Sequence, residues 1–210
     1  MPQGNEKNLI GSLVCDFTSE KSLYRQAYGG GRTQHLPRAI GMKKGHMPQI
    51  VDATAGLGRD SFLLASLGAH VLMIERSGVV YKLLKQGLIK ASKFDGNTEQ
   101  IINRMNLIHG DSKNILQSLS PEIIYIDPMH PIRKKSALVK KEMRILRDIV
   151  GADSDCGDLI RVALKRATKR VVLKWPLSAE PITGIVSPSH QIIGKTTRYD
   201  VFMINQLPMT

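Results

Sequence analysis

From residue 49 onward, short apolar runs alternate with longer amphipathic stretches, and this alternation restricts the fold of the 210-residue chain severely. Short apolar runs are typical of buried strands, and amphipathic stretches are typical of helices that cover them. The predicted strands span residues 49–53, 70–75, 105–109, 123–127 and 170–174. The predicted helices span residues 59–67, 79–93, 112–119, 137–150 and 155–168. Five βα units predict a parallel sheet with helices on both faces.

Two further strand-like runs, residues 191–194 and 199–204, follow this region and are joined by a short polar link. A parallel crossover needs a dozen or more residues, so these two strands should pair antiparallel. Five βα units closed by an antiparallel hairpin are typical of the α/β, Rossmann-like class I fold of S-adenosylmethionine-dependent methyltransferases, with a seven-stranded, mostly parallel sheet. Dinucleotide dehydrogenases normally keep a sixth parallel strand instead.

The first 45 residues contain Gly29, Gly30 and Gly31 and show no long periodic element. We therefore expect an irregular N-terminal appendage over residues 1–45 and a methyltransferase-like domain over residues 46–210. No apolar run reaches the length of a membrane span and no secretory signal is visible, so we expect a cytoplasmic protein. The two cysteines form no CxxC pair and the six histidines form no metal-binding pattern, so we expect no metal.

The chain carries 30 Lys and Arg against 18 Asp and Glu, a formal net charge of +12 that suggests a polyanionic partner. Residues 131–147 hold seven of these cations and one acid. The candidate RNA contacts there, with one in the glycine-rich N-terminal segment, are Arg32, Arg133, Lys134, Lys135, Lys140, Lys141 and Arg144. As an alternative, the segment is a solvated helix face. About six phosphate contacts would give a log-log salt slope near −4 to −5.

The most informative motif is Asp127-Pro128-Met129-His130-Pro131, which closes the apolar run at residues 123–126. A carboxylate at the end of a buried strand, next to stiff prolines that expose their carbonyls, can accept hydrogen bonds from an amino group. This arrangement suits chemistry on the exocyclic amine of a base. Few aromatic residues lie near this edge, so one extruded base is favoured over a platform that stacks many bases.

A second motif, residues 52–60, places Gly56 and Gly58 where the first strand turns into the first helix. Glycines there let the backbone approach a ligand, and the helix N-terminus offers free amides. A dinucleotide fingerprint would have glycine or alanine where Ser61 stands. The motif favours a nucleoside cofactor over a turn that serves packing alone.

Acids lie at the ends of four of the predicted strands, at Asp52, Glu75, Asp111 and Asp127. Carboxyl ends of parallel strands meet at one edge of a sheet, so these acids should converge there. Glu75 could accept ribose hydroxyls or, alternatively, pair with Arg76 or a lysine. Asp111 could accept from an adenine amino group or simply cap the following helix. A magnesium site for phosphoryl transfer is disfavoured because no phosphate-loop motif accompanies the acids.

Five segments of the chain closely resemble the family of ribosomal RNA small subunit methyltransferase J. They are residues 51–60, 74–76, 127–129, 135–144 and 169–172, and the resemblance extends over roughly residues 24–204. The resemblance implies methylation of the N2 amine of one guanine near the 3′ end of 16S ribosomal RNA, with S-adenosylmethionine as the methyl donor. It also implies cofactor contacts at Arg59, Asp60, Glu75, Arg76, Asp111, Ser112 and Asp127.

Two features depart from that family pattern. His130 stands where the family has phenylalanine, so weaker stacking on the target base is expected. The stretch before residue 24 is shorter than is usual in the family, which implies a reduced RNA-contacting region or a shortened form.

The sequence thus predicts a 16S rRNA guanine-N2 methyltransferase in which Asp127, Pro128 and His130 act on the target base. The alternatives are an adenine-N6 methyltransferase on DNA or RNA and a non-catalytic RNA-binding protein that keeps a methyltransferase fold. A dehydrogenase is disfavoured by Ser61 and by the terminal hairpin.

Overall fold

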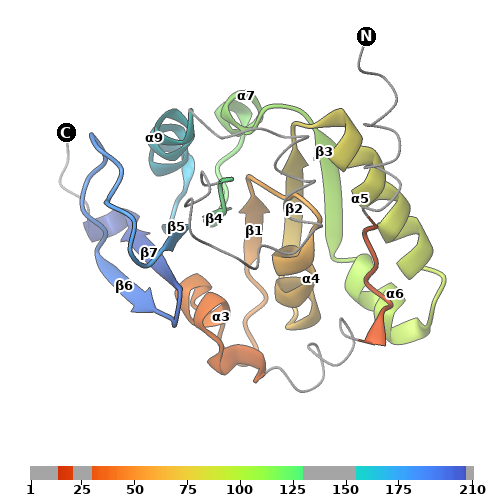
Figure 1. Cartoon of the computed structure of the whole chain (residues 1–210). Coiled ribbons are helices and arrows are strands. Elements are labelled where there is room, and N and C mark those ends of the chain that lie inside the picture. The colour runs from red at the N-terminus through yellow and green to blue at the C-terminus, as the bar shows by residue number, and fades with distance from the viewer. Residues whose placement is uncertain (1–13, 21–29, 130–154, 207–210) are drawn as a thin grey trace, which may run out of the picture.

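The computed structural model describes residues 14–20, 30–129 and 155–206, which form a single sheet flanked by helices (Figure 1). The strands are β1 Gln49–Asp52, β2 His70–Glu75, β3 Met105–His109, β4 Ile123–Ile126, β5 Arg170–Pro176, β6 His190–Ile193 and β7 Thr197–Met203. The helices are α3 His35–Ile40, α4 Arg59–Ser66, α5 Gly78–Ala91, α6 Gly96–Ile102, α7 Ser112–Ile115 and α9 Cys156–Arg166. Short 3₁₀ turns add η1 Gly31–Thr33, η2 Leu116–Ser118 and η3 Ile204–Gln206.

The seven strands lie in the order β3-β2-β1-β4-β5-β7-β6. The five strands β1 to β5 pair in parallel, and β7 pairs antiparallel with both β5 and β6. The predicted fold class, including the C-terminal antiparallel hairpin, is therefore confirmed. The strand order reverses between β1 and β4, and open α/β sheets bind ligands in the crevice beyond the carboxyl ends of strands at such a reversal.

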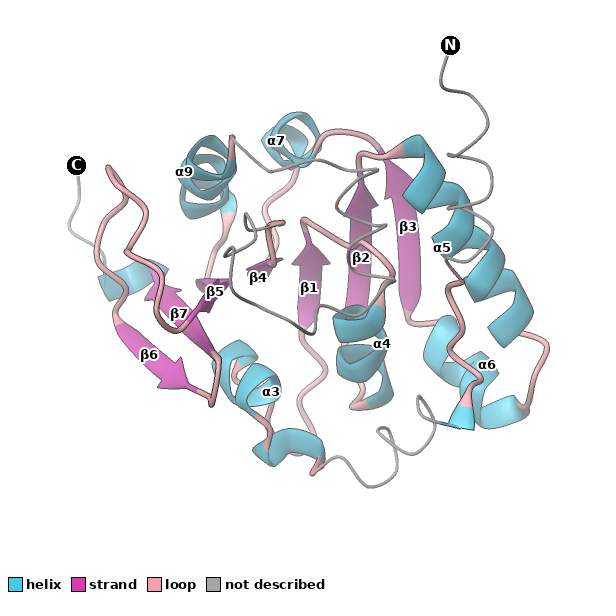
Figure 2. Ribbon diagram, viewed as in Figure 1, coloured by secondary structure: helices cyan, strands magenta, loops and turns pink. Residues whose placement is uncertain are grey.

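The strands β1, β2, β4 and β5 are buried on both faces, and their consecutive residues alternate between two hydrophobic cores. Ile50 and Val172 belong to the core on the side of α3, α4, α5 and α6. Val51 and Val171 belong to the core on the side of α9. Figure 2 shows α4 in front of the sheet at β2, with α5 beside β3. A ligand can reach the sheet beyond the carboxyl ends of its parallel strands.

Helix α5 shows how the sequence produces these layers. Its buried residues Val80, Leu84, Leu88 and Ala91 recur every three or four positions and so form one apolar stripe facing the core. Ser77 caps its N-terminus, because the side-chain hydroxyl accepts a hydrogen bond from the amide of Val80. The structure starts and ends this helix within two residues of the range predicted from the sequence.

Two helices differ from expectation. Helix α6 was not predicted, because Gly96 and Asn97 are typical of a turn, yet Asp95 caps it by accepting from the Thr98 amide at 2.6 Å. Helix α3 lies inside the stretch expected to be irregular. The helix predicted over residues 137–150 lies outside the described residues.

The described residues before position 46 pack into the main core. Phe17, Leu36 and Ile40 are at most 3% exposed and belong to the same hydrophobic cluster as Ile50. Phe17 also stacks on Phe62 of α4 with ring centroids 4.9 Å apart. The boundary at residue 45 stays a prediction, but the described part of the N-terminal stretch completes the core of the sheet.

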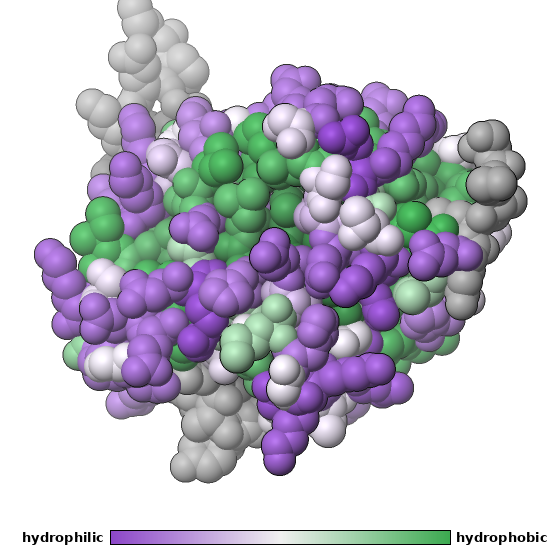
Figure 3. Space-filling view, turned by 180° about the vertical axis from the view of Figure 1, so that it is seen from behind, coloured by the Kyte–Doolittle hydropathy of each residue, from purple (hydrophilic) through white to green (hydrophobic). Residues whose placement is uncertain are grey.

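Helices cover the face of the sheet on the side of α9 less fully near β3. Helix α7 is only one turn long, and in β3 Ile108 is 39% exposed. Figure 3, which views the molecule from behind, shows apolar residues gathered at the surface between polar ones.

Among the residues that the structure describes, no helix is both long and apolar enough to cross a bilayer. Within the same residues, no group of three or more His, Cys, Asp or Glu side chains could hold a metal ion. The corresponding expectations from the sequence stay predictions for the whole chain.

Candidate active site

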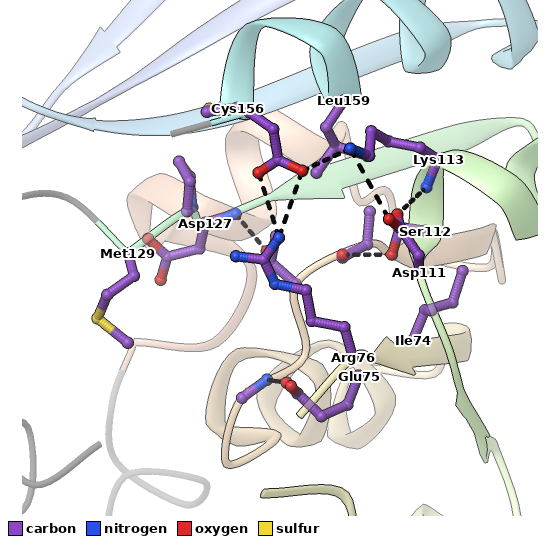
Figure 4. Close-up of a pocket in the computed structure, with 15 residues that line it drawn as sticks. Ile74, Glu75, Arg76, Asp111, Ser112, Lys113, Asp127, Met129, Cys156 and Leu159 are labelled. Carbon is purple, nitrogen blue, oxygen red and sulfur yellow. Dashed lines mark hydrogen bonds and ion pairs between the residues drawn. The ribbon is translucent and has the colours of Figure 1, made fainter. Parts of the chain in front are cut away.

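A pocket opens at the carboxyl edge of the sheet, where the strand order reverses (Figure 4). Asp127 lies on one side of it and Asp111 and Ser112 on the other, with Glu75 and Arg76 between them. Three of the four strand-end acids predicted to converge therefore line one pocket. Such a pocket, with convergent acceptors and apolar walls, is typical of a small-molecule site.

The glycine loop between β1 and α4 forms part of the wall. Gly56 lines the pocket and has φ of +53°, a left-handed conformation that glycine adopts without strain. Gly58 has φ of +68° and serves another purpose, because a Cβ atom there would lie 2.7 Å from Leu84 of α5. Of the two glycines assigned to the cofactor, Gly56 therefore borders the pocket and Gly58 allows α4 and α5 to pack closely.

Glu75, at the end of β2, holds the glycine loop in place. Its carboxylate accepts hydrogen bonds from the amide of Gly56 at 2.9 Å and from the amide of Ser77 at 2.7 Å, and the residue is 6% exposed. The same carboxylate lines the pocket, and carboxylate oxygens are acceptors of the kind that ribose hydroxyls require. The acid thus links the loop to the pocket.

Asp111 and Ser112 fix the opposite wall. Asp111 caps α7 by accepting from the amide of Lys113 at 2.8 Å, so the capping role considered as an alternative is present. The hydroxyl of Ser112 donates to the carbonyl of Ala53 at 2.6 Å and ties α7 to the end of β1. Both residues also line the pocket, so capping does not exclude contact with a ligand.

A bridge of charges joins two walls of the pocket. Asp155, just before α9, accepts from Arg76 at 3.2 Å and from the ammonium of Lys113 at 2.6 Å. All three residues line the pocket. The hydrogen bond from Lys113, followed by that from Arg76, holds the pKa of Asp155 below its usual value. Asp155 and Lys113 were not assigned to the site from the sequence, because their side chains belong to elements 42 residues apart.

Asp127 directly follows β4 and is held by the loop after β1 and by β5. Its amide donates to the hydroxyl of Thr54 at 2.6 Å, and its carboxylate accepts from Lys174 of β5 at 2.7 Å. Lys174 also donates to Asp60 of α4 at 2.8 Å. Pro128, the next residue, is buried and lines the pocket. The acceptor predicted for an amine therefore has a defined position at the pocket wall.

Asp52, the fourth strand-end acid, lies beneath the glycine loop and is not among the residues that line the pocket. It is 2% exposed and accepts from the hydroxyl of Ser61 at 2.5 Å and from the amide of Thr54 at 3.1 Å. Burial is the main cause that raises the pKa of Asp52 to about 7, against the lowering effect of those hydrogen bonds. Asp52 thus contacts the loop through the amide of Thr54 and helix α4 through Ser61.

Replacing Asp52 with asparagine should change how stability depends on pH. A raised folded-state pKa gives stability that is present below about pH 4 and lost as the pH rises through 7. Asparagine does not titrate, so the free energy of unfolding of Asp52→Asn minus that of the wild type should increase by roughly 3 kcal/mol from pH 5 to pH 8. Urea unfolding at several pH values measures this difference, and a constant difference would contradict the assignment.

Several residues assigned from the sequence do not line the pocket. Arg59 and Asp60 are the first two residues of α4, and neither lines the pocket. Arg32 donates to the carbonyl of Leu67 at 2.7 Å, at the far end of α4 from the glycine loop. The structure therefore does not bring Arg32 to the carboxyl edge. The predicted positions His130, Arg133, Lys134, Lys135, Lys140, Lys141 and Arg144 lie outside the described residues.

The donors and acceptors present fit S-adenosylmethionine. Glu75 and Asp111 offer acceptors for ribose hydroxyls and an adenine amino group, and Ile74 and Leu159 supply apolar walls for a flat ring. Gly56 has no side chain that would fill the space beside Glu75. The structure thus provides the residue types that the nucleoside part of this cofactor requires.

Comparison with known proteins supports this reading. The family model described as "Putative SAM-dependent methyltransferase" matches residues 3–204. A protein of Agrobacterium fabrum named "Ribosomal RNA small subunit methyltransferase J" is 58% identical to this chain, and the match covers 92% of the chain and 93% of that protein. A protein of the same name from Brucella anthropi is 53% identical, and the match covers 91% of this chain and 93% of that protein. Another from Chromohalobacter salexigens is 48% identical, and the match covers 97% of this chain and 81% of that protein.

Solved structures agree with the fold. The crystal structure of an SAM-dependent methyltransferase from Neisseria gonorrhoeae superposes with a TM-score of 0.71 at 34% identity, covering 93% of this chain and 76% of that one. An RNA methyltransferase from Salinibacter ruber in complex with S-adenosyl-L-homocysteine has a TM-score of 0.51 at 12% identity over 83% of this chain and 94% of that one, which shows the fold alone. The chain belongs to the ribosomal RNA small subunit methyltransferase J family of S-adenosylmethionine-dependent methyltransferases.

Proposed function

We propose that this chain methylates the exocyclic N2 amine of one guanine in the 16S ribosomal RNA of the small ribosomal subunit. The observation that carries the proposal is the placement of Asp127 at the switch-point pocket, fixed by Thr54 and Lys174 and followed by the buried Pro128. The relatives named above act on small-subunit ribosomal RNA according to their names. A ribosomal substrate also supports a cytoplasmic location.

The exocyclic amine of guanine is a poor nucleophile, because its lone pair is delocalised into the ring. The chain must therefore hold the amine so that its lone pair is aimed at the methyl group. Asp127 accepts one amine hydrogen and the carbonyl of Pro128 accepts the other, which fixes the plane of the amine. The Asp127 carboxylate also stabilises the positive charge that develops on nitrogen and can take the proton.

S-adenosylmethionine, when bound, supplies an activated methyl group on a sulfonium. In this proposal Glu75 accepts the ribose hydroxyls and Asp111 accepts from the adenine amino group. Arg76, Ser112 and the amides near Gly56 would complete the contacts, whereas Arg59 and Asp60 do not line the pocket. Support comes from the position of Glu75, Arg76, Asp111 and Ser112 around one pocket.

The RNA contacts belong to the basic segment that follows Asp127 in the sequence. Arg133, Lys134, Lys135, Lys140, Lys141 and Arg144 would neutralise phosphates of the flanking RNA, and His130 would stack on the guanine. These roles rest on sequence position and on the position of Asp127 at the pocket, because the structure does not describe the segment itself. Arg32 is not included among contacts near the target base, since it lies at the far end of α4.

The function is tested by locating the transferred methyl group. Small subunits and free 16S rRNA from cells lacking the gene are incubated with the purified protein and methyl-labelled S-adenosylmethionine, and the RNA is digested to nucleosides. The proposal expects label in N2-methylguanosine at one position and none with RNA from wild-type cells. Label in N6-methyladenosine would favour the adenine alternative. Binding of S-adenosylmethionine without any transfer would favour the non-catalytic RNA-binding alternative.

A further inference from the structure

Lys174 of β5 connects the pocket residue Asp127 to helix α4 through a single ammonium group. The residue lies near the end of β5, and its side chain is 26% exposed. Its Nζ lies 2.7 Å from the carboxylate of Asp127, at the end of β4, and 2.8 Å from the carboxylate of Asp60, in the first turn of α4. One cation therefore links the acid at the target side of the site to an acid on the helix that follows the glycine loop.

The charge on this ammonium is strongly favoured by its surroundings. Burial alone lowers the pKa of a lysine, but Asp60 and then Asp127 more than compensate, and the pKa of Lys174 is raised well above its usual value. A half-buried lysine with two carboxylate partners is costly to desolvate and gains little net stability from an ion pair. This arrangement is thus better explained by positioning than by folding stability.

Asp60 is held by a second donor, which makes the arrangement rigid. The hydroxyl of Tyr125 donates to the same Asp60 oxygen at 2.7 Å, and Tyr125 is 1% exposed. Burial raises the pKa of Tyr125 well above its usual value, so the hydroxyl keeps its proton and acts as the donor. Tyr125 holds Asp60 in place, Asp60 holds the ammonium of Lys174, and Lys174 in turn holds the carboxylate of Asp127.

We propose that Lys174 is a positioning residue for methyl transfer, which orients the Asp127 carboxylate toward the target amine by anchoring it to Asp60. The inference rests on the proposed function, because it assigns Asp127 the role of amine acceptor. Displacement of a reacting group by about 1 Å can lower a rate about 10²-fold even when binding is kept. Lys174 therefore acts on turnover through Asp127, without contact with the methyl donor.

The test compares purified Lys174→Met with the wild type. We expect kcat for transfer to the small subunit or to 16S rRNA to fall about 10²-fold, with KM for the RNA and Kd for S-adenosylmethionine within about fivefold of wild type. Lys174→Arg, which can bridge two carboxylates, should recover part of the lost kcat. A crystal structure of Lys174→Met should show the Asp127 side chain in a changed orientation.

Lys169→Met is the matched control. Lys169 pairs with Glu122 at 2.8 Å on the surface, so the same chemical change there removes an ion pair remote from the pocket, and kcat should not change. Thermal unfolding shows whether each variant is folded. If Lys174→Met does not fold, Lys174→Gln, which keeps a polar group on a side chain one bond shorter, is expected to show the same loss of kcat.

The outcomes separate this inference from the proposed function. A wild-type protein that methylates guanine, together with a folded Lys174 variant whose kcat equals that of Lys169→Met, would overturn the positioning role only. A fall in kcat matched by an equal fall in affinity for S-adenosylmethionine would assign Lys174 to cofactor binding instead. That result would also overturn the positioning role. A wild-type protein that binds S-adenosylmethionine but transfers no methyl group would contradict the proposed function and this inference together.

Discussion

Replacement of Asp127 with alanine is expected to lower methyl transfer about 10³-fold or more while S-adenosylmethionine still binds with Kd within about fivefold of wild type. The carboxylate is the acceptor that orients the amine and stabilises the charge developing on it. Its removal leaves the walls formed by Glu75, Asp111 and Ser112 intact. Single-turnover transfer to small subunits and calorimetric titration of S-adenosylmethionine measure the two quantities.

A conservative variant and a remote variant sharpen this test. Asp127→Asn keeps the size of the side chain and one acceptor oxygen but loses the charge facing Lys174, so an intermediate rate is expected. Glu122→Ala removes a carboxylate that precedes β4 and pairs with Lys169 at 2.8 Å, and it should leave turnover unchanged. Near-normal turnover by Asp127→Ala would eliminate the assignment of this residue as the amine acceptor.

Much of the sheet could be predicted because each buried strand is an apolar run with a clear end. The bounds predicted for β2 and β3 agree with the structure, and those for β1 and β4 differ by one residue. The hairpin followed from chain length alone, since four residues cannot make a parallel crossover. Helix α6 was missed because Gly96 and Asn97 favour turns, and the signal that could have identified it was the cap Asp95 followed by Ile101 and Ile102.

The acids of the site could be predicted only in part, because the strand pleat decides which way each one faces. Val51 and Ala53 point to the core on the side of α9, so Asp52 points to the other face and meets Ser61 of α4. The position of Asp52 at the end of a strand does not by itself predict its contact with Ser61. Glu75, Asp111 and Asp127 reach the pocket because they follow or end strands at its rim.

Partners distant in the sequence could not be predicted at all. Lys174 and Asp127 are 47 residues apart, and Arg76 and Asp155 are 79 apart, so no local pattern links them. A charged residue inside the otherwise apolar run of β5 was the available signal for Lys174. Because lysine is rarely buried without a partner, such a residue indicates a nearby carboxylate.

Replacement of Glu75 with alanine is expected to lower the affinity for S-adenosylmethionine at least about 100-fold and to destabilise the fold by roughly 2–4 kcal/mol. Two effects combine. The variant loses the acceptor proposed for the ribose hydroxyls, and hydrogen bonds to a charged group contribute about 1.5–3 kcal/mol each. It also leaves the amides of Gly56 and Ser77 without their carboxylate acceptor in a site that is 6% exposed, so the glycine loop loses its anchor.

Two further variants separate these effects of Glu75. Glu75→Gln keeps the length of the side chain, but its amide group places a donor against one of the backbone donors of Gly56 and Ser77, so both affinity and stability should fall by intermediate amounts. Glu122→Ala removes a surface carboxylate paired with Lys169 and should change neither. Calorimetric titration gives the affinity and urea unfolding gives the stability. If Glu75→Ala is destabilised yet binds S-adenosylmethionine as the wild type does, Glu75 serves the loop alone, and the ribose contact must come from another residue of the pocket.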